Sequence, residues 1–246
     1  MGNLVNITIF GFISGILGTG VGGMFAFFIN NINNRLLGFI LEFSAGLMTS
    51  VVCFELVPEA FELGGTELTL TGIVLGILVI IIIENFIRKA DFMKRSHGNS
   101  GLLRAGILVA IGLALHNFPE GFAVGSGIEA SLSLGMTITA VIVIHDVPEG
   151  IAMAVPMRAG GFSKWKSFIL TVLSGIPMGF GALAGALLGE ISKGMVSLCL
   201  GFAGGAMLYI IFGELVPESK RLYLGRLSSI GNIIGILCGI IISTYS

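Results

Sequence analysis

Two copies of a polar motif lie inside long apolar runs, and their side chains could bind a metal cation. The first copy reads His116-Asn117-Phe118-Pro119-Glu120-Gly121, and the second, in the next apolar run, reads His145-Asp146-Val147-Pro148-Glu149-Gly150. Two of the three histidines of the chain therefore occupy the same position of a duplicated motif. Polar residues at the centre of a membrane span are costly and usually functional. A duplicated set of imidazole, amide and carboxylate groups there indicates a cation site.

The spacing within each motif places the candidate ligands together on a helix. His116 and Glu120 are four positions apart and share one helix face, with Asn117 one position round. The second motif repeats this arrangement with His145, Asp146 and Glu149. Each motif begins about 14 residues into its apolar run, near the middle of a bilayer at a rise of about 1.5 Å per residue. Neutral imidazole and carboxylate oxygens suit Zn²⁺, Fe²⁺ or Mn²⁺, and the lack of a thiolate disfavours Cu⁺.

The composition identifies the class of protein. Of the 246 residues, 54% are hydrophobic and 11% are charged, and the mean hydropathy is +1.00. A soluble domain carries about 25% charged residues. Apolar runs of about 20 residues or more are long enough to cross a bilayer as helices. The sequence predicts an all-α polytopic membrane protein without nucleic-acid partners. Its three scattered cysteines (Cys53, Cys199 and Cys238) are expected to be small buried hydrophobes.

The order of the elements follows from the apolar runs. Residues 1–246 are expected to form a single transporter domain embedded in lipid. Its eight spans are predicted at about 4–29, 36–61, 68–90, 102–127, 131–157, 164–190, 193–217 and 224–245. The first run lacks a basic segment before it and a clear cleavage site, so it is interpreted as a retained helix. The linker at about 91–101 is basic and polar and holds the third histidine, His97.

The basic residues predict the orientation of these spans. Cytoplasmic loops of membrane proteins are enriched in Lys and Arg. Twelve of the thirteen Lys and Arg residues lie in or next to the loops that follow the first, third, fifth and seventh spans, and the other side holds only Lys193. Both termini are therefore predicted to be extracytoplasmic. A compact chain of this kind is expected in a prokaryotic plasma membrane.

An internal repeat, with a constant offset of 159 in the numbering, relates the second span to the seventh. The segment 43–48 followed by Glu55-Leu56-Val57-Pro58-Glu59 matches the segment 202–207 followed by Glu214-Leu215-Val216-Pro217-Glu218. Because the two spans run in opposite directions, we expect an inverted repeat, spans one to three against six to eight, around spans four and five. Glu55 and Glu59 would lie near the outer mouth of a cation route, and Glu214 and Glu218 near the cytoplasmic mouth. Met48 and Met207 of the repeat are predicted to serve packing rather than soft metal contacts.

The two polar motifs resemble the fourth-span and fifth-span signatures of the ZIP family of divalent-metal transporters. The eight spans, the outward termini and the loop after the third span are also similar, so the resemblance covers the whole chain. It implies uptake of zinc or related metals into the cytosol by a homodimer. It also implies an elevator-like movement of spans one, four, five and six against spans two, three, seven and eight.

The resemblance also implies roles for individual residues. The first metal would be bound by His116, Glu120 and Glu149, and the second by Asn117, Asp146 and Glu149. His145 occupies a position that varies in the family, and Met48 lies near a position that can approach the first metal. Many members carry a Glu before the proline of span six, but this chain reads Leu173-Ser174-Gly175-Ile176-Pro177-Met178. The second site is therefore expected to be weak or absent. The linker likewise lacks the histidine-rich tract of some relatives.

Zn²⁺ uptake is the function that the residues and the resemblance together favour, with Fe²⁺, Mn²⁺ and Cd²⁺ as further substrates. No organic cofactor and no enzymatic activity are expected. A membrane metalloenzyme is one alternative, because His and carboxylate clusters also build oxidative metal centres in helical bundles. A metal sensor that binds without conducting and a proton-coupled exporter are the others.

Overall fold

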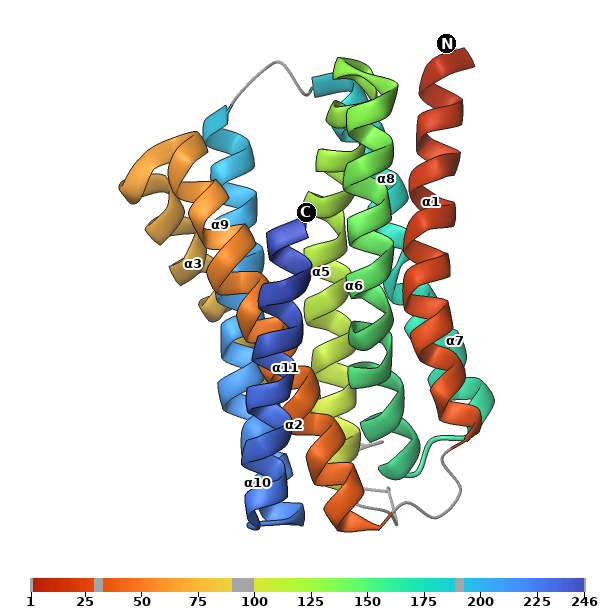
Figure 1. Ribbon diagram of the computed structural model, residues 1–246, viewed down its shortest axis with the longest axis vertical. Coiled ribbons are helices and arrows are strands. Elements are labelled where there is room, and N and C mark those ends of the chain that lie inside the picture. Colours follow the sequence, from red (N-terminus) through yellow and green to blue (C-terminus); the bar gives the residue numbers. More distant parts are fainter. Residues whose placement is uncertain (1, 29–32, 90–99, 189–192, 246) are drawn as a thin grey trace.

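Long helices make up nearly all of the computed structural model (Figure 1), which describes residues 2–28, 33–89, 100–188 and 193–245. No strand occurs among these residues. Within them, seven helices are long and apolar enough to cross a membrane. The chain is therefore an all-helical, polytopic membrane protein, as the composition predicted. His97 and most of its linker lie outside the described residues.

The helices overlap the predicted spans, but the spans predicted at about 36–61 and 68–90 lie in one apolar segment, Asn34–Ile87. The elements are α1 (Gly2–Gly23), η1 (Met24–Phe27), α2 (Asn34–Val51), η2 (Val52–Leu56), α3 (Val57–Lys89), α5 (Ser100–Ala130), α6 (Leu132–Ala159), α7 (Lys164–Ser174), α8 (Ile176–Leu188), α9 (Lys193–Ile210), η3 (Ile211–Leu215), α10 (Val216–Leu222) and α11 (Arg226–Tyr245). The predicted span at 164–190 is interrupted between α7 and α8. Pro177 has no N–H to donate to the carbonyl of Leu173, so the helical hydrogen bonding cannot continue there.

The longest apolar segment, Asn34–Ile87, has 54 residues. One crossing needs only about 20. The segment contains Gly65, whose positive φ and extended ψ fall in a region essentially restricted to glycine. Ser197 of α9 donates a hydrogen bond to the carbonyl of Ala60 at 2.7 Å and lies 3.2 Å from the hydroxyl of Thr69. Residues on both sides of Gly65 thus meet the same point of α9, and α3 doubles back at this glycine.

The helices form two groups, which stand side by side in Figure 1. The first group contains α1, α5, α6, α7 and α8, and the second contains α2, α3, α9, α10 and α11; each helix packs mainly within its own group. The groups meet chiefly where α5 lies along α9 and α6 along α2. This division corresponds to the two sets of spans that the family resemblance implies.

Two short π-helical segments occur at equivalent positions of the sequence repeat. They are η2 (Val52–Leu56) and η3 (Ile211–Leu215), and their numbering differs by 159, the offset of the repeat. π-Helical turns inside longer helices are rare and often lie at functional sites. Each segment includes one of the predicted route carboxylates, Glu55 or Glu214.

Close helix contacts recur with the same offset. Gly46 of α2 packs against the carbonyl of Asn232 in α11, and Gly205 of α9 packs against the carbonyl of Ile73 in α3. Neither glycine leaves room for a Cβ atom. Gly205 lies 159 positions after Gly46, and Ile73 lies 159 positions before Asn232. Small residues allow such close approach of helices in lipid.

Candidate metal site

Helices α5 and α6 bring one imidazole and two carboxylates together. Nε2 of His116 lies 3.0 Å from Oε1 of Glu120 on the same helix and 4.0 Å from Oε1 of Glu149 on α6. The exposed fractions of the three residues are 0%, 4% and 0%. Taking carboxylates out of water is strongly unfavourable unless cations or hydrogen-bond donors compensate for their charge. A buried histidine facing two carboxylates can supply such an environment for a divalent cation.

The helices continue through the prolines of both motifs. Pro119 lies inside α5 and Pro148 inside α6, and neither ends its helix. A proline removes one intrahelical hydrogen bond and leaves the carbonyl four positions earlier without its usual donor. These carbonyls belong to Leu115 and Ile144, each next to a motif histidine. The backbone beside the site therefore offers acceptor oxygens as well.

Asn117 is held by the break between α7 and α8. Its Nδ2 donates a hydrogen bond of 2.8 Å to the carbonyl of Ser174, the last residue of α7. Its Oδ1 is buried and accepts no hydrogen bond from the described residues. Buried acceptors are normally paired with a donor or a cation. This amide oxygen, which no described donor contacts, can therefore serve as a neutral ligand for a cation.

Asp146 is positioned by a glycine of α1. Asp146 is fully buried, and a Cβ added to Gly18 would overlap its side chain. One turn further along α1, Gly22 packs against the carbonyl of Val147 and the Cα of Gly150. The glycines of the first span therefore allow α1 to lie directly on the motif segment of α6.

The described part of the site does not contain a complete set of metal ligands. Among the described residues, no three His, Cys, Asp or Glu side chains are grouped closely enough to hold a metal ion together. The side chain of His145 lies outside the described part of the structure, although its backbone belongs to α6. A cation bound by His116 and Glu120 would compete with their direct contact of 3.0 Å.

The four predicted route carboxylates differ in their exposure. Glu55 is half-buried and Glu59 is exposed, whereas the exposed fractions of Glu214 and Glu218 are 3% and 4%. Oε2 of Glu214 lies 3.1 Å from Nε of Arg104 on α5, and Oε2 of Glu218 lies 3.3 Å from Nη1 of Arg221. The two ends of the repeat thus have different environments in this structure.

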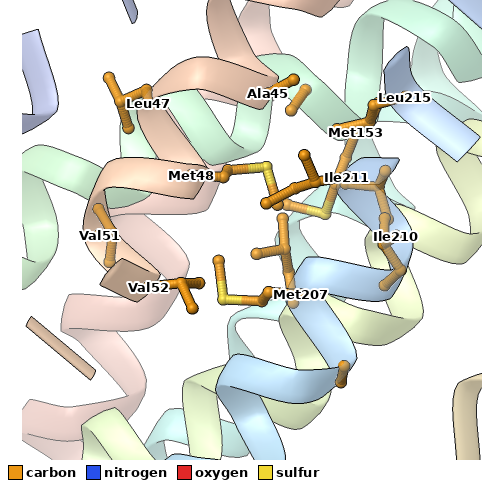
Figure 2. Close-up of a cluster of buried hydrophobic side chains, with 14 of the residues drawn as sticks. Ala45, Leu47, Met48, Val51, Val52, Met153, Met207, Ile210, Ile211 and Leu215 are labelled. Atoms are coloured by element: carbon orange, nitrogen blue, oxygen red, sulfur yellow. The ribbon is translucent and has the colours of Figure 1, made fainter. Parts of the chain in front are cut away.

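Met48 and Met207 lie in the apolar core between the helix groups. Both are at most 1% exposed, and they belong to one hydrophobic cluster with Met153 of α6. In Figure 2, the side chains of Met48 and Met153 approach each other beside Ile211, and that of Met207 points toward Val52. Met48 and Met207 therefore pack against apolar neighbours in this structure.

Several polar partners were not predicted from the sequence. Oγ of Ser174 donates a hydrogen bond of 3.2 Å to the sulfur of Met153, which places Ser174 between the site and the methionine cluster. Glu42 of α2 is buried and pairs with Lys220 and Asn232, both at 2.9 Å. Glu42 lies inside an apolar run, and an intramembrane carboxylate is itself a signal of function or pairing.

A cavity of about 820 Å³ lies beside the site, between the two helix groups. Phe118 and Pro119 of the first motif contribute to its wall, together with Leu173, Leu198 and Phe202. Nearly all of its lining is apolar. A cation needs oxygen, nitrogen or sulfur ligands along its path, so this cavity does not provide the route.

Comparison with known proteins identifies the family. The sequence model described as ZIP zinc transporter matches residues 89–245, more than half of the chain. The chain belongs to the ZIP zinc transporter family. Members of this family are transporters, not enzymes, and this excludes the metalloenzyme alternative.

Relatives that are similar over nearly their whole length support this assignment to the ZIP family. The protein named zinc transporter ZupT from Stenotrophomonas maltophilia is 34% identical over 236 residues, covering 89% of this chain and 88% of its own. ZupT from Akkermansia muciniphila is 33% identical over 244 residues, covering 90% of both chains. Zinc transporter GufA from Myxococcus xanthus is 32% identical, covering 82% of this chain and 84% of its own.

Proposed function

We propose that this ZIP family member takes up Zn²⁺ into the cytosol of a prokaryotic cell. The observation that carries the proposal is the approach of His116 on α5 to Glu120 and Glu149, all of them buried within helices that can cross a membrane. Imidazole and carboxylate are common zinc ligands. The names of the related bacterial proteins agree with this substrate.

The proposed ligand set has two parts. His116, Glu120 and Glu149 bind the transported ion, and Asn117 and Asp146 with Glu149 form a second, weaker position. His145 contributes to the first from α6. The proposed weakness of the second position rests on span six, which has no carboxylate before Pro177. Fe²⁺, Mn²⁺ and Cd²⁺ are proposed as further substrates, because they share these ligands and differ in preferred geometry and availability.

We further propose that the chain crosses the membrane eight times and contains an inverted repeat. The reversal of α3 at Gly65 supports two crossings by the segment Asn34–Ile87. The paired π-helical segments and the glycine contacts at ±159 support the repeat. In Figure 1, α1 begins and α11 ends toward the same side of the bundle, as an even number of spans requires. The positions of the basic residues put this side outside the cytoplasm.

Cysteine labelling tests this topology. Thr66, next to the turn at Gly65, and Ser163, between α6 and α7, are both exposed. In a background in which the three native cysteines are replaced by alanine, Thr66→Cys should react with a membrane-impermeant thiol reagent added outside intact cells. Ser163→Cys should react only after permeabilisation. The opposite pattern would reverse the orientation, and equal protection of both residues in intact cells would contradict an outward turn.

Zinc flux into proteoliposomes tests the function. The purified protein is expected to produce saturable uptake of radioactive zinc, with competition by the other divalent cations in the order of their affinities. The same vesicles without protein provide the baseline. Stoichiometric zinc binding in detergent without flux would instead favour a metal sensor. Zinc movement out of the cytosolic side that requires an inward proton gradient would favour an exporter.

The homodimer implied by the family resemblance is a separate proposal. Its test is the protein mass in detergent, corrected for bound detergent, by light scattering. A value near the chain mass of 25.7 kDa at all protein concentrations would contradict a dimer.

A further inference from the structure

The first turns of α5 are attached to the other helix group by an ion pair. Nε of Arg104 lies 3.1 Å from Oε2 of Glu214 in η3, and the exposed fractions of the two side chains are 24% and 3%. Arg104 belongs to the group that contains the candidate metal site, and Glu214 belongs to the second group. The pairs Lys220–Glu42 and Tyr209–Glu84 both lie within the second group. The Arg104–Glu214 contact therefore links the two groups at one end of the bundle.

Arg104 supplies the positive charge that faces the buried carboxylate of Glu214. The nearby carboxylate of Glu84 on α3 accepts a hydrogen bond of 2.6 Å from the hydroxyl of Tyr209 instead. Removing Arg104 would leave a buried charge without its counter-ion, which is costly.

A second carboxylate reaches α5 one turn further along. Glu218 lies four positions after Glu214 and is 4% exposed, and a Cβ added to Gly101 would lie 2.8 Å from its Oε1. Its carboxylate therefore packs against the backbone of α5 at Gly101. Glu214 and Glu218 together hold the beginning of α5 against η3 and α10.

Further from this end, the boundary between the helix groups is apolar and adaptable. Met48 from the second group faces Met153 from the first (Figure 2), and Met207 belongs to the same hydrophobic cluster. Methionine side chains are unbranched and flexible, so they repack easily when neighbouring helices shift. The polar contacts of Arg104 give this end of the boundary a definite geometry that the methionine cluster does not impose.

The equivalent carboxylates at the other end of the repeat are not enclosed in this way. Glu55 and Glu59 correspond to Glu214 and Glu218 by the offset of 159, yet Glu59 is exposed and Glu55 is half-buried. The carboxylates at the Glu214 end of the repeat are therefore enclosed by packing and ion pairs, whereas those at the Glu55 end are more exposed.

We propose that Arg104 is a positioning residue that keeps the cytoplasmic mouth closed by occupying Glu214, and that a divalent cation leaving the central site opens the mouth by displacing it. The proposal rests on the function and orientation given above. A divalent cation carries twice the charge of a guanidinium and binds carboxylate oxygens directly. Arg104 is partly exposed, so it can turn into water when it is displaced. Opening would then depend on the presence of the transported ion.

Labelling of a buried position on α5 tests this proposal. Leu108 is fully buried one turn beyond Arg104. With the native cysteines replaced by alanine, Leu108→Cys should react slowly with an impermeant thiol reagent applied to the cytoplasmic side of inside-out vesicles. Adding Arg104→Gln should accelerate the reaction about tenfold, the population shift expected from loss of one partly buried ion pair. Zinc should accelerate labelling when Arg104 is present and have little effect in Arg104→Gln.

Three further variants make the result specific. Arg221→Gln removes a charge that pairs with Glu218 within α10 and should leave labelling unchanged. Arg104→Lys should give an intermediate rate, because it keeps the charge without the planar geometry. Glu214→Gln should accelerate labelling as Arg104→Gln does. It replaces Arg104→Gln in the test if that variant fails to insert into the membrane. Equal labelling with and without Arg104, or an equal response to zinc, would overturn the proposal. Zinc flux is measured separately. Altered labelling without any zinc flux would reject the proposed transport function but would support the closing role of Arg104.

Discussion

Replacing His116 by alanine is expected to lower zinc uptake by about 100-fold or more, since even outer-shell changes at metal sites cost about 10- to 100-fold. His116 is the described imidazole that faces carboxylates of two different helices, at 3.0 Å from Glu120 and 4.0 Å from Glu149. Glu149→Ala should have an effect of similar size, because Glu149 is the carboxylate that α6 contributes. Uptake into proteoliposomes under initial-rate conditions measures both effects.

Matched controls separate loss of a ligand from loss of structure. His97→Ala removes the histidine of the linker, and Glu67→Ala removes an exposed carboxylate near the turn of α3. Both should keep uptake within about twofold of the wild type, because neither belongs to the proposed ligand set and substitutions away from such features usually have small effects. Insertion and the melting temperature in detergent should be retained in His116→Ala. Near-normal uptake by a properly inserted His116→Ala or Glu149→Ala protein would refute the assignment of the site.

Replacing Gly18 by alanine is expected to damage both stability and transport. The added Cβ would overlap the Cβ of Asp146 and lie 2.8 Å from its Oδ2, so α1 must move away from α6 or Asp146 must move. Overpacking of this kind costs about 1–3 kcal/mol. For a chain of this size the melting temperature should fall by about 5 °C. Zinc uptake should fall about tenfold, because Asp146 lies next to the ligands in the second motif.

Gly20 provides a matched control on the same helix. A Cβ added there meets no heavy atom closer than Val172 Cγ2 at 3.5 Å, an ordinary van der Waals distance. Gly20→Ala should therefore keep the wild-type melting temperature and uptake, and it adds the same methyl group in the same membrane environment. If Gly18→Ala and Gly20→Ala behaved alike, the close contact between α1 and the motif segment of α6 would have no functional role.

The proposed closing contact of Arg104 and the central site suggest a common physical requirement for transport. His116 lies 3.0 Å from Glu120 and Arg104 lies 3.1 Å from Glu214, so in both places a cation would compete with an existing interaction. Binding must be strong enough to strip water from the ion and weak enough to release it. Internal partners that compete with the ion meet the second condition, because they favour its departure.

Much of the fold and part of the site could be predicted from the sequence, because they depend on local properties of the chain. The lengths of the apolar runs indicated the helices, and the four-position spacing of His116 and Glu120 predicted their contact on one helix face. The repeat offset of 159 likewise anticipated the paired segments η2 and η3 as equivalent positions, although not their π-helical form. Hydrophobic periodicity alone did not predict the break at Gly175, which follows from Pro177.

Only the tertiary structure decided which distant groups meet. The approach of Glu149 to His116, the capture of Asn117 by Ser174 and the pairing of Arg104 with Glu214 join residues that are 33, 57 and 110 positions apart. Such contacts depend on the rotation of each helix about its axis and on its choice of neighbours. Glycine contacts and proline breaks set both of these, and in lipid they replace the hydrophobic patterning that orients helices in water. Local spacing thus determined the chemistry that each helix can present, and packing determined which of these groups act together.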